Sequence, residues 1–140
     1  MKQQIQILLQ TLISGSDDEK LSCLIDIGDY IEMGHPPDED LIKVIQELIA
    51  RLPLESNNKI RHLLFRNIAT AYRQPADLSE LDYSPVIEIM DNSDPEFICN
   101  TCYILSLTNN KKYIAAISKY LSSSNEKIRA EAQDAINYLQ

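Results

Sequence analysis

The feature that most constrains this chain is a pattern of apolar and helix-capping residues that recurs after 31 residues. When residues 113–140 are moved back by that distance, apolar and small residues coincide without a gap: Ile117 on Val86, Ile128 on Phe97, Ala132 on Thr101, Ala135 on Ile104 and Ile136 on Leu105. Self-similarity at a fixed period is typical of repeat proteins, in which one unit cannot bury its apolar face alone. The pattern therefore predicts stacked, related helical units.

A second echo extends the repeat toward the N-terminus. Residues 56–61 (SNNKIR) resemble residues 124–129 (SNEKIR), and Leu64 and Ile68 then fall on Ala132 and Ile136. The first 34 residues fit more loosely, with Leu21, Ile25 and Gly28 in the places of Ile128, Ala132 and Ala135. We therefore expect all parts of the chain to share one helical pattern.

No stretch of the chain alternates between apolar and polar residues as a half-buried strand does. Apolar residues recur instead at helical spacing, which predicts an all-α protein. The expected helices span about 2–14, 17–33, 38–53, 56–72, a short segment from 84, 94–108, 111–121 and 125–139. We expect them to form four antiparallel pairs in a single domain, residues 1–140, with the pairs at about 1–34, 38–73, 83–108 and 111–140.

Turn residues give the expected helix ends. The predicted N-caps are Ser16 or Asp17, Ser56, Asp94 before Pro95, and Ser124, because short polar side chains accept hydrogen bonds from the first free backbone N–H groups. Gly34 is expected at the first position after the second helix, where a left-handed conformation favours glycine. Stacking the four pairs predicts a short α-solenoid.

Residues 94–97 (DPEF), followed by 105–114 (LSLTNNKKYI), resemble a HEAT repeat. Residues 125–129 (NEKIR), followed by Ala132, Ala135 and Ile136, are similar to the second helix of the same repeat. Ile98 departs from the pattern, which usually has Arg there, so the usual Asp–Arg ladder is incomplete. The resemblance implies a right-handed curved stack with the second helices on its concave side, and binding rather than catalysis.

The net charge of −8 is unevenly distributed. Residues 1–40 carry nine acids and two bases, and residues 77–96 carry seven acids and no base, whereas residues 41–76 carry two acids and six bases. An acidic chain does not gain affinity for phosphate backbones through counterion release, so nucleic acid is not expected as a partner. The charge favours a basic protein partner, although acidic residues also keep proteins soluble without any partner.

Cellular location is predicted from the cysteine count, the N-terminal segment and the lengths of the apolar runs. The chain has three cysteines, an odd number, and its apolar N-terminal segment is interrupted by glutamines and lacks a cleavage site. No run approaches the roughly 18 apolar residues of a membrane span. We expect a cytoplasmic protein that does not bind membranes.

The residues capable of chemistry form no recognised catalytic or metal-binding set. Cys99 and Cys102 have C-x-x-C spacing but no preceding strand and no second pair of ligands, so a redox or zinc site is not expected. Asp26 and Asp29 could act as an acid–base or metal pair, but a charged, solvated helix face is the favoured explanation. We therefore predict no enzyme activity and no cofactor.

The HEAT-like register predicts a protein-binding surface on the concave side: Asp26, Asp29, Tyr30, His62, Phe65, Arg66, Cys99, Cys102 and Tyr103. The C-terminal 50 residues also resemble small bacterial immunity proteins, which implies neutralisation of a cognate toxin domain, often cationic. Three alternatives remain: an enzyme or enzyme subunit similar to HEAT-like bilin lyases, a general interaction scaffold, and a HEAT-like DNA glycosylase, which the acidic charge disfavours.

Overall fold

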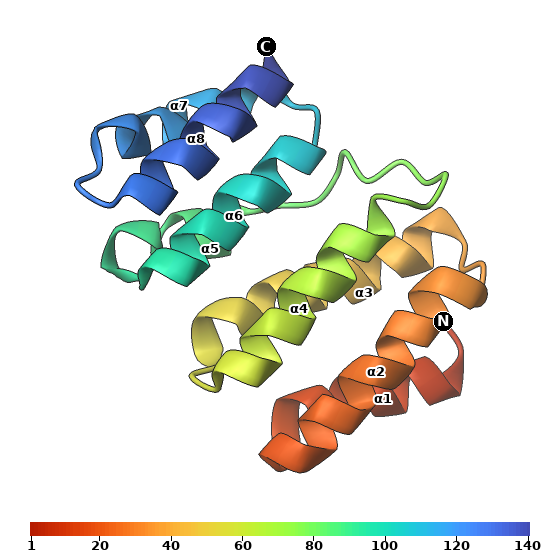
Figure 1. Ribbon diagram of the computed structural model, residues 1–140. Coiled ribbons are helices and arrows are strands. Elements are labelled where there is room, and N and C mark those ends of the chain that lie inside the picture. Colours follow the sequence, from red (N-terminus) through yellow and green to blue (C-terminus); the bar gives the residue numbers. More distant parts are fainter. The chain divides into compact units, whose positions relative to one another are not determined.

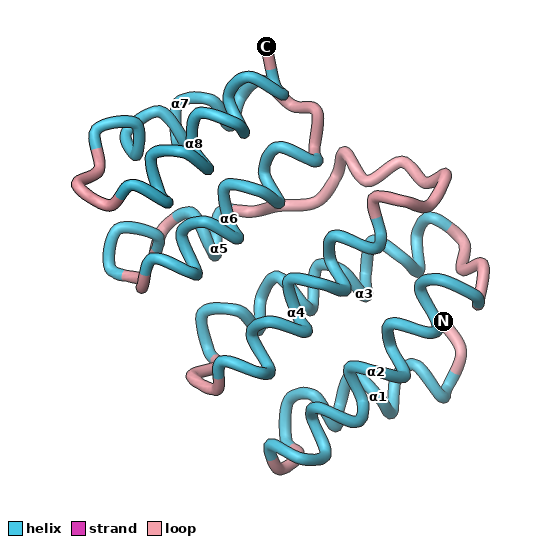
Figure 2. The backbone as a smooth tube through the Cα atoms, viewed as in Figure 1, coloured by secondary structure: helices cyan, strands magenta, loops and turns pink.

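The computed structural model describes residues 1–140 and contains helices and no strands (Figures 1 and 2). The eight α-helices are α1 (Gln3–Ser14), α2 (Asp17–Met33), α3 (Asp38–Arg51), α4 (Asn58–Ala71), α5 (Ser84–Ile87), α6 (Pro95–Leu107), α7 (Ile114–Ser118) and α8 (Glu126–Leu139). Four short 3₁₀ turns join them: Leu52–Leu54, Met90–Asn92, Lys111–Tyr113 and Lys119–Ser122. The prediction of an all-α chain is confirmed. The chain divides into two compact units, Met1–Asp82 (unit 1) and Tyr83–Gln140 (unit 2).

Unit 1 is built from two layers of helices. Helix α2 packs on α1 and on α4, and α4 packs on α3. In Figure 1, α2 and α4 form the nearer layer, with α1 behind α2 and α3 behind α4. The apolar side chains between the layers are fully enclosed, among them Leu24, Ile27, Ile31, Val44, Ile45, Leu48, Ile60, Leu64 and Ile68. Each contributes about 1.5–3 kcal/mol by leaving water, so this seam holds unit 1 together.

Two hydrogen bonds fix how α2 lies against α4. The buried Asn67 side chain on α4 donates to the Leu24 carbonyl on α2 at 2.8 Å, and at the helix starts Asn57 donates to Asp17 at 3.1 Å. The absence of a side chain at Gly28 permits this close contact, because a Cβ there would lie 2.8 Å from the Asn67 side-chain oxygen. The two helices therefore run side by side in the same direction, with their N-terminal ends level.

Unit 2 is smaller, and beside the long helices α6 and α8 it has only the short helices α5 and α7 with 3₁₀ turns. Helix α8 packs on α6 and on α7. The Tyr83 and Tyr113 rings meet edge to face, with centroids 5.9 Å apart. The Tyr120 hydroxyl donates to Asp91 at 2.6 Å, and Lys119 bonds the other oxygen of that carboxylate at 3.0 Å. The two bonds to Asp91 join the 3₁₀ turn before α6 to the one after α7.

The helix starts confirm some predicted caps and correct others. Ser16 caps α2 in a complete capping box with Glu19, and Asp94 caps α6. The caps predicted at Ser56 and Ser124 are wrong, because the next residue in each case, Asn57 or Asn125, accepts from the backbone N–H groups. Asparagine is an equally good cap, and it leaves the serine one residue outside the helix.

The repeated SNxKIR motif has the same local structure in both units. Each cap asparagine accepts from two backbone N–H groups, at 2.9 and 3.2 Å in both α4 and α8. The arginine at the end of the motif folds back in both cases: Arg61 donates to the Glu55 carbonyl and Arg129 to the Ser123 carbonyl, each two residues before its cap. The sequence echo therefore encodes a shared helix start.

Three further details differ from prediction. Gly34 has φ −82°, and His35, at φ 47°, takes the left-handed conformation in its place. The helix expected over 111–121 is instead two 3₁₀ turns around the short α7. In α2 the predicted register is wrong: Ile25 is 58% exposed, whereas Cys23, Leu24 and Ile27 are buried. Counting from the true cap, Ser16, puts Cys23 and Ile27 at the positions of Ala132 and Ile136 counted from Asn125.

No helix of the chain combines the length and apolar character that crossing a bilayer requires.

Candidate binding face

The outer side of α2 carries an acidic stripe, defined here as Asp18, Asp26, Asp29 and Glu32, all exposed. Two apolar side chains stand among these carboxylates, Ile25 at 58% and Met33 at 65% exposure. Helix α2 holds six acids and one base, Lys20. Lys20 points away into unit 1 and is bound to Glu55. No ion pair neutralises the stripe.

The neighbouring helix carries charge of the opposite sign. Lys59, His62, Arg66 and Arg73, the last just beyond the end of α4, are exposed and are called the basic stripe here. Helix α4 holds three bases and no acid. None of the four side chains forms an ion pair. The basic stripe is therefore as free to meet a partner as the acidic one.

The two stripes lie next to each other on one surface, here called the α2/α4 face. Helices α2 and α4 are in contact along their length, and α1 and α3 cover their opposite sides. Although adjacent, the two stripes form no ion pair with each other. The contacts between α2 and α4 are made by Asp17 with Asn57 and by Leu24 and Gly28 with Asn67, and none of these residues belongs to either stripe. Uncompensated charge of both signs is therefore presented side by side.

A buried ion cluster fixes the base of this face. Glu55, between α3 and α4, accepts from Lys20 at 2.6 and 3.1 Å and from Arg51 at 3.1 Å. Its side chain is 4% exposed, and those of its two partners are 13% and 14% exposed. The cluster joins the start of α2, the end of α3 and the start of α4. Its burial makes it a structural element rather than a docking residue.

The predicted binding residues of unit 1 divide between surface and interior. Asp26, Asp29, His62 and Arg66 are exposed on the α2/α4 face. Tyr30 is half-buried, and burial, followed by the charge of Asp40, raises its pKa. Phe65, predicted as a contact residue, is only 7% exposed, and its ring is part of the interior.

The predicted residues of α6 lie in unit 2. Tyr103 is 47% exposed, Cys99 is half-buried, and Cys102 is fully buried. Burial, and then the neighbouring Cys99, raises the pKa of the Cys102 thiol to about 12, and burial also raises the pKa of Cys99. Cys102 therefore does not line an open surface as expected, because its side of α6 faces inward. Both thiols are held protonated at neutral pH, unlike a reactive redox pair.

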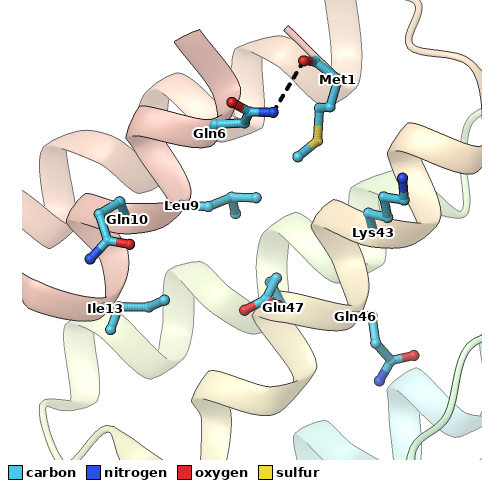
Figure 3. A pocket seen from close by; sticks show the side chains of 8 residues that line it. All are labelled: Met1, Gln6, Leu9, Gln10, Ile13, Lys43, Gln46 and Glu47. Atoms are coloured by element: carbon cyan, nitrogen blue, oxygen red, sulfur yellow. Dashed lines mark hydrogen bonds between the residues drawn. The ribbon is translucent and has the colours of Figure 1, made fainter. Parts of the chain in front are cut away.

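Two openings lie away from the α2/α4 face. A groove of about 440 Å³ runs between α1 and α3, with Leu9 and Ile13 on one side and Lys43 and Glu47 on the other (Figure 3). A shallow recess of about 700 Å³ in unit 2 is lined by the starts of α6 and α8, with Cys99 beside Lys127. Neither opening gathers an acid–base pair around a buried polar group. No cluster of three or more His, Cys, Asp or Glu side chains is placed to hold a metal ion.

Comparison with known proteins adds no assignment: no family model matches the chain, and no curated protein matches it. The binding face therefore has to be interpreted from its own residues.

Six residues of the face were missed from sequence: Asp18, Ile25, Glu32, Met33, Lys59 and Arg73. Ile25 was assigned to the core by a register two residues out of step. The signal that corrects it is the capping box, because Ser16 and Glu19 have the required spacing and fix the start of α2. Lys59, His62, Arg66 and Arg73 recur at helical spacing, so a helical projection of α4 would have shown them as one stripe.

Proposed function

We propose that the chain is a protein-binding module, and that a basic surface of its partner docks on the acidic stripe of α2. The observation that carries the proposal is the combination of unpaired carboxylates with two largely exposed apolar side chains, Ile25 and Met33. Oppositely charged surfaces steer encounter and fix orientation. Apolar side chains at the centre of a contact supply most of the affinity when they are desolvated. A solubilising surface alone would not require exposed isoleucine and methionine on the same stripe.

The proposal extends to the kind of fold that presents this face. We propose that the helix pairs are HEAT-like repeats of a short right-handed α-solenoid and that the second helices carry the binding side chains. Two features support this: the shared cap-and-arginine structure of α4 and α8, and the common cap-to-core spacing of α2 and α8. Repeat proteins use such extended helical surfaces to bind other proteins.

A narrower form of the proposal follows from the resemblance to immunity proteins. The chain then binds one copy of a cognate toxin domain with a basic active-site surface and covers that site. The acidic stripe supports this form, because a cationic enzyme domain is the complementary surface. The reaction belongs to the partner, and the chain contributes contacts only.

The test is binding to the product of the adjacent gene. The two proteins are purified separately and mixed, and the complex is measured by light scattering and calorimetry. We expect a 1:1 complex whose affinity falls as salt is raised. The double variant Asp26→Arg, Asp29→Arg should weaken binding by at least about tenfold, because two attractive contacts become repulsive. A matched control, Glu80→Arg with Glu88→Arg, reverses two exposed acids elsewhere and should leave affinity within about twofold.

Absence of binding to the adjacent gene product would overturn the immunity form. Equal loss of affinity in the test and control variants would overturn the assignment of the acidic stripe, because net charge rather than α2 would then govern binding. Rescue of cells from the toxin by co-expression separates neutralisation from simple association.

A further inference from the structure

We infer that, without a partner, the α2/α4 face binds a second copy of this chain, with the acidic stripe of each copy lying on the basic stripe of the other. This inference does not depend on the proposed function, because it concerns the isolated chain. It rests on the presence of both signs of charge on one face. Opposite charges lie side by side on two helices that run in the same direction with their starts level.

Symmetry selects one arrangement of two such faces. A two-fold axis lying in the face and parallel to the helices places α2 of one copy over α4 of the other and keeps every residue at its own height. The perpendicular in-plane axis would place α2 over α2 and set acid against acid. Two-fold interfaces are the commonest in homo-oligomers and require a self-complementary surface. The parallel axis meets that requirement here.

The charges match in height along the helices. Asp18 and Lys59 are each the second residue of their helices. Asp26 is the tenth residue of α2 and Arg66 the ninth of α4. Glu32 is the sixteenth residue of α2, and Arg73 stands sixteen positions along from the start of α4. At about 1.5 Å per residue, all three acid–base pairs coincide to within about one residue rise.

Positions along α2 and α4 can be compared directly because hydrogen bonds hold the two helices in register. The Asn57–Asp17 bond holds the helix starts level. Farther along, Asn67, the tenth residue of α4, lies against Leu24 and Gly28, the eighth and twelfth residues of α2. The register is therefore kept from the helix starts to the middle of the face.

The size of the face predicts a weak, salt-sensitive dimer. Helix α2, at 17 residues, is about 25 Å long, and two adjacent helices are about 20 Å wide. Such a face buries about 500 Å² on each copy, which is at the low end for specific association. The net charge of −8 on each copy opposes association elsewhere on the surface, so the complementary stripes set the orientation. A partner that docks on α2 would compete with the dimer.

The test uses two charge-reversal variants. Each should dimerise poorly by itself, and the two should dimerise with each other when mixed. Asp26→Arg sets two arginine side chains against each other at this level of both contacts, and Arg66→Asp sets two aspartates against each other, so each variant alone replaces an attraction by a repulsion. In an equimolar mixture, however, an arginine meets an aspartate at this level of both contacts. Sedimentation of the full chain at low salt should show dimers of the unaltered protein, a loss of at least about tenfold in dimer affinity for each variant, and recovery in the mixture.

Controls and contrary outcomes are defined by the same experiment. Lys111→Asp and Glu88→Arg change charge equally at exposed positions of unit 2 and should leave the dimer affinity within about twofold. Circular dichroism establishes that all variants are folded. A monomer at low salt and high protein concentration would overturn the inference. So would a mixture that dissociates as readily as its components, because only contacts between α2 and α4 of different copies predict recovery.

Discussion

Each unit contains a carboxylate that accepts hydrogen bonds from two side chains, and the two carboxylates differ in their burial. In unit 1, Glu55 is enclosed with Lys20 and Arg51, and its side chain is 4% exposed. In unit 2, Asp91 meets Tyr120 and Lys119 at the surface, and its side chain is 62% exposed. A buried charge that loses its counter-ion has no water to replace it, whereas an exposed one does. Two donor residues around a carboxylate therefore imply rigidity in unit 1 and only local order in unit 2.

Removing Glu55 should give the largest effect. Glu55→Ala leaves Lys20 and Arg51 without their shared carboxylate in a mostly buried site, and we expect unit 1 to lose about 3–5 kcal/mol of stability. Urea denaturation with hydrogen exchange resolves the loss by helix, because amides of α4 should lose protection while those of α8 keep theirs. Asp91→Ala is the matched variant in unit 2 and should shift the urea midpoint only slightly. Equal shifts for both variants would contradict the contrast.

The helix contacts differ between the units as well. In unit 2, α8 presents the small residues Ala132 and Ala135 to its neighbours, whereas in unit 1 α4 presents Asn67 to Gly28. Loss of this polar contact should give the second-largest effect on stability. Asn67→Ala removes a buried hydrogen bond and should cost about 1–3 kcal/mol.

Gly28→Ala tests the same contact, because its effect on stability should have opposite signs with and without the Asn67 side chain. Alanine favours a helix by about 1 kcal/mol over glycine, but its Cβ would displace the Asn67 side chain from the Leu24 carbonyl. We expect Gly28→Ala to destabilise the unaltered protein and to stabilise the Asn67→Ala variant. Denaturation of the four proteins in a double-mutant cycle measures the sign, and the same sign in both backgrounds would contradict the close approach.

The helix caps provide a third prediction, about 1 kcal/mol in size. Asn57→Ala and Asn125→Ala each remove the side chain that accepts from two backbone N–H groups. Asn57→Ala should cost more, because Asn57 also bonds Asp17 on α2. Ser56→Ala and Ser124→Ala change the residue before each cap and should leave the melting temperature almost unchanged. A larger loss from the serines would restore the caps first predicted.

Sequence patterns predicted the helices more reliably than the side of each helix that faces outward. Periodicity and turn residues suffice for the positions of the long helices because both act locally. The exposure of Ile25 and the burial of Cys102 depend on the helix register and on neighbouring helices. The capping box at Ser16 contained the register of α2, but the level alignment of α2 with α4 required the Asn57–Asp17 and Asn67–Leu24 bonds. Such contacts join residues about 40 positions apart, which no local pattern specifies.

The smallest expected effect concerns pH and unit 2. The hydrogen bond from Tyr120, followed by that from Lys119, lowers the pKa of Asp91. A carboxyl group with a lower pKa in the folded state adds stability above its unfolded pKa of about 4 and loses that contribution as the pH falls further. Asp91→Asn should therefore lower the melting temperature slightly near pH 7, with the difference from the unaltered protein shrinking below about pH 4. Glu88→Gln, at an exposed carboxylate without a hydrogen bond, is the control. A difference that instead grows as the pH falls would mean that Asp91 is destabilising when ionised, and its bond to Tyr120 would not hold the turns of unit 2 together.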